Sequence, residues 1–203
     1  MKANTVAKIL AWALMGPIVF ASQVAADVLH HGETRSLVVS GPTSEHQAML
    51  VTRAFANHEI DTVYMWGDGG EFYAGLDIGR SIKASGARVI IPTGKECISA
   101  CAFAAMGAGE ILPDGDMLLH RPFTVQVPSM ASMEAIAGHY GMAYMDMAEY
   151  LIEMGYGIGL AKYVIEQSTP CRFLVIENHS DVVAVRTGVN ELVISDKCYQ
   201  DAR

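Results

Sequence analysis

The sequence predicts an α/β fold in which parallel strands alternate with helices that pack outside them. Short apolar runs and amphipathic helical patterns follow one another in the order strand, turn, helix, and this order repeats along the chain. The apolar runs are continuous, which is typical of parallel strands whose two faces are both covered. The chain has 203 residues, 51% of them hydrophobic and 18% charged, so it can bury the core of one such domain.

Turn residues divide the chain into its expected elements. Glycine or proline ends apolar runs at residues 41–42, 67–70 and 92–94. We therefore expect strands at residues 36–41, 62–66, 88–91 and 117–119. Helices are expected after the capping residue Ser44, before the terminating residue Gly86, and over residues 99–107, 132–154 and 158–167.

The first 26 residues have the layout of a secretory signal peptide. Lys2 and Lys8 give a positive start, residues 9–20 are almost wholly apolar, and small residues precede a cleavage point after Ala26. The apolar run of 12 residues is shorter than the roughly 20 that a membrane-spanning helix needs. We expect a periplasmic or secreted protein with no transmembrane anchor after cleavage, in which residues 27–203 form a single domain.

Charge and motifs argue against several classes of partner. Removal of residues 1–26 takes away two lysines and no acidic residue, so the formal net charge changes from -8 to -10. A negative surface argues against nucleic acid as a partner. The chain has no glycine-rich phosphate loop, and we expect no cofactor. No metal site is expected, because no ligand spacing recurs among His30, His31, His46, His58, His139 and His179.

Export would allow disulfides among the four cysteines, Cys97, Cys101, Cys171 and Cys198, which permit three pairings. Cys171 with Cys198 would close a loop near the C-terminus and stabilise the fold by about 3 to 4 kcal/mol. Cys97 with Cys101 requires Cys97 to lie in the turn before a helix, because cysteines four apart inside a regular helix cannot meet. Zinc is the rival interpretation, although the spacing fits no common zinc pattern.

Three strand ends deliver functional residue types to one edge of the predicted sheet, where ligands tend to bind. Gly69-Gly70 follows one strand, Ser99 begins the helix after the next, and His120 follows the third. A serine in the first turn of a helix lies beside free N–H groups that favour an oxyanion. Gly70 lets the chain approach a substrate closely and present its own N–H. His120 supplies the commonest kind of base near neutral pH.

Each of these residues also has a structural interpretation. Ser99 stands where helix caps are common, His120 precedes a proline and can be a structural histidine, and Gly69-Gly70 can be a plain turn. The presence of all three in this order favours catalysis over the separate structural interpretations.

Several motifs extend this pattern. Gly69-Gly70 follows a strand, Ser99 lies within Cys-Ile-Ser-Ala-Cys, and the triplet His120-Arg121-Pro122 comes next. In these features residues 65–122 resemble the Clp-type proteolytic subunits of the Clp and crotonase superfamily. Exported periplasmic members of that superfamily are still more similar, since they share a Gly-Leu-x-Ile-Gly-Arg stretch, here residues 75–80, and a Cys-x-Ser-Ala-Cys box, here residues 97–101. The resemblance extends weakly over residues 37–193.

The resemblance implies a ClpP/crotonase-like fold and a serine hydrolase mechanism. Ser99 would be the nucleophile, His120 the general base, and the amides of Gly70 and Ala100 the oxyanion donors. Cys171 stands where the family has its aspartate, so the third member of the triad stays open. The neighbouring carboxylates that could replace it are Glu166, Glu177 and Asp181.

These features predict an exported, peptidase-like serine hydrolase that acts on a peptide or another acyl substrate. The alternative is a catalytically inactive exported scaffold or binding protein of the same fold. A crotonase-like thioester site is a third interpretation, which export argues against. The resemblance also implies a homo-oligomer assembled through the long helix at residues 132–154, whose methionines otherwise pack within one subunit: Met142, Met145, Met147 and Met154.

Overall fold

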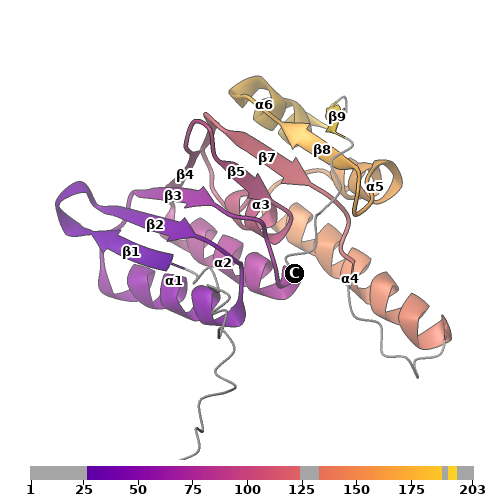
Figure 1. Cartoon of the computed structure of the whole chain (residues 1–203), viewed down its shortest axis with the longest axis horizontal. Helices are drawn as coiled ribbons and strands as arrows, with labels where there is room; N and C mark the ends of the chain where they lie inside the picture. The colour runs from indigo at the N-terminus through magenta and orange to yellow at the C-terminus, as the bar shows by residue number, and fades with distance from the viewer. Residues whose placement is uncertain (1–26, 124–132, 189–191, 196–203) are drawn as a thin grey trace, which may run out of the picture.

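A computed structural model describes residues 27–123, 133–188 and 192–195 and shows two sheets with helices packed around them (Figure 1). The strands are β1 (Asp27–His31), β2 (Ser36–Ser40), β3 (Thr62–Trp66), β4 (Arg88–Ile91), β5 (Glu96–Ile98), β6 (Ile111–Pro113), β7 (Asp116–Leu119), β8 (Phe173–Ile176) and β9 (Val193–Ser195). The helices are η1 (Gly32–Thr34), α1 (Glu45–Asn57), α2 (Phe72–Ser85), α3 (Ala100–Ala105), α4 (Met133–Glu153), α5 (Ile158–Gln167) and α6 (His179–Thr187). The arrangement confirms the predicted α/β class.

The first sheet has the strand order β1-β2-β3-β4-β6. Its pairs are parallel except that of β1 with β2, which is antiparallel. The register aligns Ser36 with Thr62 and Thr62 with Arg88, so β2, β3 and β4 start level and point their carboxyl ends to the same edge. The parallel strands predicted at residues 36–41, 62–66 and 88–91 are confirmed.

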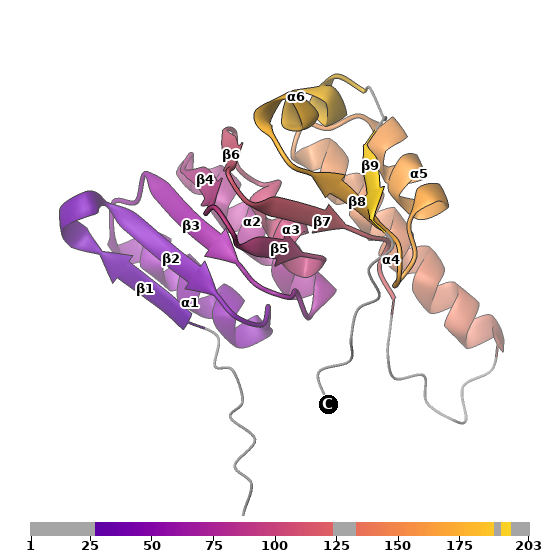
Figure 2. The ribbon, with the colours of Figure 1, turned by 45° about the horizontal axis from the view of Figure 1, so that its top comes forward.

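Helices α1 and α2 cover one face of this sheet (Figure 2). Leu37 and Val63 are buried in its strands. Tyr64 points to the opposite face and is 36% exposed. That face is therefore covered less completely than the continuous apolar pattern of the strands predicts.

The second sheet has the order β5-β7-β8-β9. Strands β5 and β7 are parallel, whereas β7, β8 and β9 run antiparallel. The sequence predicted only the strand at residues 117–119 here. The three-residue strands β5 and β9 carry too little pattern to recognise, and the four-residue apolar run of β8 was missed although all four residues are buried. The two sheets meet where the Gly67 N–H donates to the carbonyl of Glu96 over 2.9 Å.

The helix boundaries follow the predicted signals. Ser44 caps α1 by accepting a hydrogen bond from the Gln47 N–H over 3.2 Å. Gly86 ends α2 with a φ of 72°. Helices α3, α4 and α5 begin and end within two residues of their predicted ranges.

Two glycines of α2 let α3 and α4 approach closely. A Cβ on Gly75 would lie 2.5 Å from the carbonyl oxygen of Ala100, and a Cβ on Gly79 would overlap the hydroxyl of Tyr150. That hydroxyl donates to the carbonyl of Phe103 over 2.7 Å. The glycines of the Gly-Leu-x-Ile-Gly-Arg stretch therefore fix the position of α3, the helix that Ser99 precedes.

Helix α4 packs along the core with one half and projects from the body with the other (Figure 1). Met147, Met154 and Tyr150 are buried. Met142 and Met145 are 59% and 65% exposed. The four methionines of the predicted helix therefore divide between core packing and an exposed surface.

No helix in the described part of the chain combines the length and the apolar content that a bilayer crossing requires. The predicted leader, residues 1–26, lies outside the described residues. The first described element is β1, which begins at Asp27.

Candidate active site

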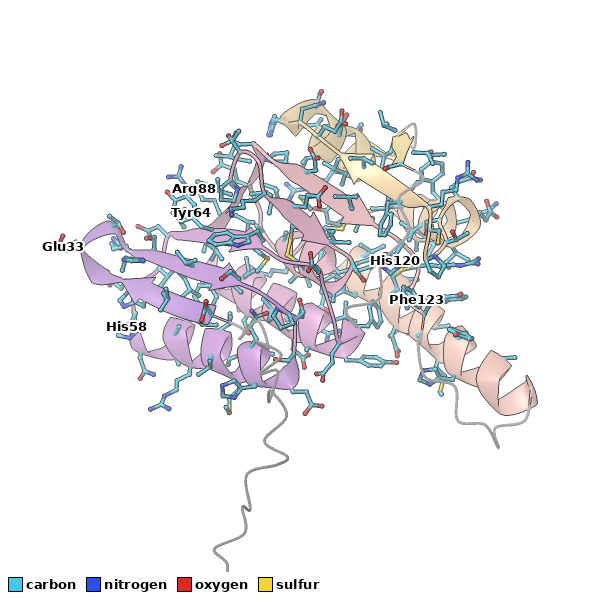
Figure 3. The ribbon with its side chains drawn as sticks, in the orientation of Figure 1. Glu33, His58, Tyr64, Arg88, His120 and Phe123 are labelled. Carbon is cyan, nitrogen blue, oxygen red and sulfur yellow. A yellow bond between two sulfur atoms is a disulfide. The ribbon has the colours of Figure 1, made fainter. Side chains whose placement is uncertain are left out.

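A cleft of about 730 Å³ is lined by residues that follow three strands, β3 of the first sheet and β5 and β7 of the second. Gly70 follows β3, Ser99 follows β5 and His120 follows β7, and all three line the cleft. The structure thus brings together the three residues that the sequence placed at one edge, although Ser99 follows β5 of the second sheet and not the predicted strand at residues 88–91. Figure 3 labels His120 with Phe123 next to it, beside the helix α4.

Ser99 occupies the turn between β5 and α3 with a φ of 57° and a ψ of -120°. A positive φ is rare for a residue with a Cβ, and such strain clusters at functional turns between a strand and a helix. The Ser99 N–H donates to the carbonyl of Leu118 over 2.8 Å, which ties the turn to β7. Its hydroxyl makes no capping hydrogen bond to α3 within the described residues. The interpretation of Ser99 as a capping side chain is therefore wrong.

His120 is 2% exposed, and its Nδ1 lies 2.8 Å from the carbonyl oxygen of Arg121. A carbonyl can only accept, so the neutral ring carries its proton on Nδ1 and leaves a lone pair on Nε2. Nε2 has no hydrogen-bond partner among the described residues, the Ser99 hydroxyl included. Contacts between a serine and its base are often long in ligand-free sites and tighten with substrate.

Two aromatic rings enclose the imidazole of His120. The Phe123 ring lies 5.0 Å from it between centroids, and the Phe173 ring lies 5.1 Å away in an edge-on orientation. Burial in this apolar setting lowers the pKa of His120, and the hydrogen bond to the Arg121 carbonyl opposes that shift in part. The ring is therefore held in the neutral form that a general base requires.

The carboxylates proposed as third member of a triad are not hydrogen-bond partners of His120 in the described part of the chain. Glu166 is exposed and forms an ion pair with Lys162 over 3.8 Å. Glu177 and Asp181 follow the far end of β8, because β8 runs antiparallel to β7 and its first residues are those beside the end of β7. Within the described residues, no carboxylate forms a hydrogen bond with His120.

Cys171, which the sequence resemblance aligns with the aspartate of the Clp-type subunits, cannot act as an acid, because it is exposed and disulfide-bonded. Its predicted partner, Cys198, lies outside the described residues. The carbonyl of Arg121 therefore occupies the position beside Nδ1 that a triad gives to a carboxylate.

The backbone of Gly70 is arranged as an oxyanion donor would be. Thr43 accepts from the Glu71 N–H over 2.9 Å and donates to the Gly69 carbonyl over 2.8 Å. Thr43 and Gly70 thus form a parallel bridge, in which Thr43 bonds to the residues before and after Gly70 and not to Gly70 itself. The N–H of Gly70 therefore points away from Thr43, and it has no hydrogen-bond partner in the described chain. A Cβ on Gly70 would overlap the carbonyl oxygen of Thr43, so only glycine fits. The N–H of Ala100, in the first turn of α3, lacks an intrahelical acceptor as well.

Ser168 anchors the segment that carries His120, and sequence reasoning missed it. Its buried hydroxyl accepts from the Arg121 N–H over 2.7 Å and donates to the Val164 carbonyl over 2.6 Å. The Arg121 guanidinium also donates to the Ile165 carbonyl over 3.3 Å. A serine just after a helix is common, so no sequence signal distinguished this one.

A disulfide joins Cys97 and Cys101, with Cα atoms 5.2 Å apart. The sequence required Cys97 to lie before the helix for this pairing, and it lies in β5. The bridge therefore spans the Ser99 turn, with one sulfur in the strand and the other in α3.

The lining of the cleft combines apolar and acidic side chains. Its carboxylates are Glu45, Glu71 and Asp77, and the described lining residues include no lysine or arginine. Glu71 accepts a hydrogen bond from the Glu45 N–H over 2.8 Å, and Asp77 pairs with Arg80 over 3.3 Å. Within the described residues, the Glu45 carboxylate makes neither a hydrogen bond nor an ion pair, and the bond to Glu71 is made by the backbone N–H of Glu45. The apolar lining includes Phe72, Phe103, Pro122 and Phe123.

No protein-family model and no curated protein matches the sequence. Among solved structures, the fold is similar to that of a point mutant of ClpP1 from Listeria monocytogenes. The TM-score is 0.55 and the identity 16%, and the match covers 84% of this chain and 94% of that chain. The chain therefore has a ClpP-like fold.

Proposed function

We propose that the chain is an exported, peptidase-like serine hydrolase in which Ser99 attacks an acyl carbon and His120 acts as the base. The observation that carries this proposal is the pairing, in one cleft, of a strained serine with a buried histidine whose Nε2 is unpartnered within the described residues. A buried, unpaired nitrogen is costly in a structural role, whereas a base needs it.

In the proposed reaction, Ser99 Oγ forms a bond to the acyl carbon while Nε2 of His120 takes the hydroxyl proton. The carbonyl electron pair moves onto oxygen, where the amides of Gly70 and Ala100 donate hydrogen bonds. The proton on Nε2 then passes to the leaving group as the scissile bond breaks. Water repeats both steps on the acyl-enzyme, releasing the acid and restoring the serine.

The Arg121 carbonyl takes over one task of the missing acid, since it fixes the tautomer and orientation of the ring. It carries only a partial negative charge and therefore stabilises the imidazolium less than a carboxylate does. Loss of the carboxylate costs on the order of 10⁴ in turnover in serine triads. We accordingly expect slow turnover by an activated serine.

Labelling with a fluorophosphonate probe tests the proposal directly. The signal-free protein should be labelled, and Ser99→Ala and His120→Ala should both abolish labelling while retaining the folded near-ultraviolet spectrum. Ser180→Ala, on the exposed start of α6, is the matched control and should label as the wild type does. Wild-type protein that stays unlabelled over hours would contradict the proposal.

The second candidate function is an inactive scaffold or binding protein of the same fold. The observation that favours it is that the residue at the family's aspartate position is a disulfide-bonded cysteine, Cys171, which has neither a carboxylate nor an ionisable thiol. An unlabelled wild type that binds peptides in the cleft would support this function.

We also propose that the chain forms a homo-oligomer through the exposed part of α4. Met142 and Met145 on α4 are largely exposed, and Ile152 and Ile158 extend the same apolar character toward α5. Met142 and Met145 are three residues apart and are therefore neighbours on the helix surface, and adjoining exposed apolar side chains are typical of interaction surfaces. Light scattering after gel filtration should show an oligomer that Met142→Glu/Met145→Glu reduces to monomers. Val183→Glu, at another exposed apolar position, should leave the mass unchanged.

Export is proposed from the leader-like residues 1–26 and from the disulfides, which persist in oxidising compartments. Expression of the full chain in a bacterium with fractionation should recover a protein that begins at Asp27. Intact leader on a cytoplasmic product would refute this part of the proposal.

A further inference from the structure

The Cys97–Cys101 bridge encloses a segment of three residues with Ser99 at its centre. Cys97 is held in β5, where it pairs with Met117 of β7. Cys101 is the second residue of α3. The bridge therefore links the strand that enters the turn to the helix that leaves it.

The backbone of Ser99 needs such a link, because its φ of 57° is unfavourable for a residue with a Cβ. If the turn relaxed to negative φ, the serine would become an ordinary helix-start residue. Its hydroxyl could then accept a hydrogen bond from an N–H in the first turn of α3, as capping serines do. The hydroxyl would be lost to the cleft without any unfolding of the domain.

The bridge is also placed to be permanent. Cys97 is 0% exposed and Cys101 is 4% exposed. Soluble reductants cannot reach sulfurs at this depth in the folded protein. The location therefore suits a fixed constraint and does not suit a redox switch.

We propose that the Cys97–Cys101 bridge is a positioning element of the active site, which holds Ser99 in the conformation that directs its hydroxyl into the cleft. This inference rests on the proposed hydrolase function. It predicts that loss of the bridge lowers the reactivity of the serine more than it lowers the affinity of the site.

The experiment compares Cys97→Ala/Cys101→Ala with wild type by the kinetics of fluorophosphonate labelling. The maximal inactivation rate should fall about 10- to 100-fold, as small displacements of reacting groups do, while the half-saturating probe concentration changes less than about twofold. Val51→Ala is the matched control, because it removes buried volume from α1 away from the turn. It should lower the melting temperature and leave both labelling constants unchanged.

Hydrogen exchange gives a readout that does not depend on activity. The Ser99 amide, which donates to Leu118 in the wild type, should exchange faster in the bridge variant while the amides of β2 and β3 keep their protection. Cys97→Ser/Cys101→Ser repeats both measurements with side chains closer in size to cysteine.

Several outcomes would overturn the inference. Equal inactivation rates in wild type and both bridge variants would show that the turn holds itself. An equal increase in the hydrogen-exchange rates of all amides, or unfolding of both variants, would show that the bridge only stabilises the domain. A wild type that is never labelled contradicts the hydrolase proposal. In that case the hydrogen-exchange rate of the Ser99 amide still tests the bridge, because an unchanged rate in both variants would show that the bridge does not position Ser99.

Discussion

The imidazole Nδ1 of His120 lies 2.8 Å from the carbonyl oxygen of Arg121, the next residue in the chain. The partner that fixes the tautomer of the base is thus part of the same loop as the base itself. A backbone carbonyl cannot be removed by substitution, so the orientation of His120 depends on what holds residue 121 in place.

The Ser168 hydroxyl holds the backbone of residue 121 by accepting a hydrogen bond from its N–H. Replacement by alanine leaves the Arg121 N–H without its acceptor, which we expect to cost about 1 to 3 kcal/mol of folding free energy. The labelling rate should fall as well, because the His120 loop loses its anchor. Urea unfolding and fluorophosphonate kinetics measure the two effects. Ser85→Ala removes comparable backbone hydrogen bonds at the end of α2 and should affect stability alone. Unchanged labelling in Ser168→Ala would separate this anchor from the site.

The labelling rate should stay high to a lower pH than an exposed histidine base would allow. Burial lowers the pKa of His120, so the neutral base persists to lower pH than in an exposed histidine. We expect the labelling rate to be constant above the ordinary histidine pKa of about 6.5 and to fall with a midpoint below it. Phe123→Ala admits water to the ring and should move the midpoint upward. A wild-type midpoint at or above the ordinary value would contradict the assignment of His120 as base.

The glycines of α2 that face its neighbouring helices should tolerate no side chain. Gly79→Ala forces a Cβ against the Tyr150 hydroxyl, and we expect a loss of about 1 to 3 kcal/mol in the free energy of unfolding. Gly138→Ala in α4 meets open space and should stabilise the helix by up to about 1 kcal/mol. Chemical denaturation of the two variants measures the difference. Equal stabilities would mean that α2 and α4 pack less closely than the structure indicates.

The acidic lining predicts a preference for positively charged substrates. Phosphonate inhibitors on short peptides with lysine should label Ser99 faster than matched peptides with glutamate at low salt. Glu45→Gln should lower the ratio of the labelling rate with the lysine peptide to that with the glutamate peptide by about two- to fivefold, which is the effect of a partly exposed charge pair. Added salt should lower this ratio further. Glu59→Gln, which removes a carboxylate that pairs with Arg35 outside the cleft, is the control. An unchanged ratio in Glu45→Gln would remove this carboxylate from the specificity of the cleft.

The sequence predicted the parts of the molecule that depend on local patterns. Continuous apolar runs ended by glycine or proline located β3 and β4, and Ser44 and Gly86 marked helix ends by their capping chemistry. Ser99 and His120 were expected at one edge because parallel strands end on the same side of a sheet.

What the sequence could not supply was the identity of backbone partners. The carbonyl beside Nδ1 of His120 carries no residue-type signature, so carboxylates at positions 166, 177 and 181 were the natural candidates. Strand β8 runs antiparallel to β7, which separates the last two of them from His120. The helical patterns predicted α4 and α5 between the two strands, but they do not show in which direction the chain pairs with β7 when it returns as β8.

The depth of the Cys97–Cys101 bridge has a consequence for the order of events during maturation. An oxidising enzyme needs physical access to both thiols, and α2 closes over α3 in the finished domain. Oxidation must therefore come before closure, while the nascent chain is still open. A chain that folded before it met an oxidant would bury Cys97 and Cys101 as free thiols. The redox state of these two cysteines in the folded protein would then report whether the chain folded in a reducing or an oxidising compartment.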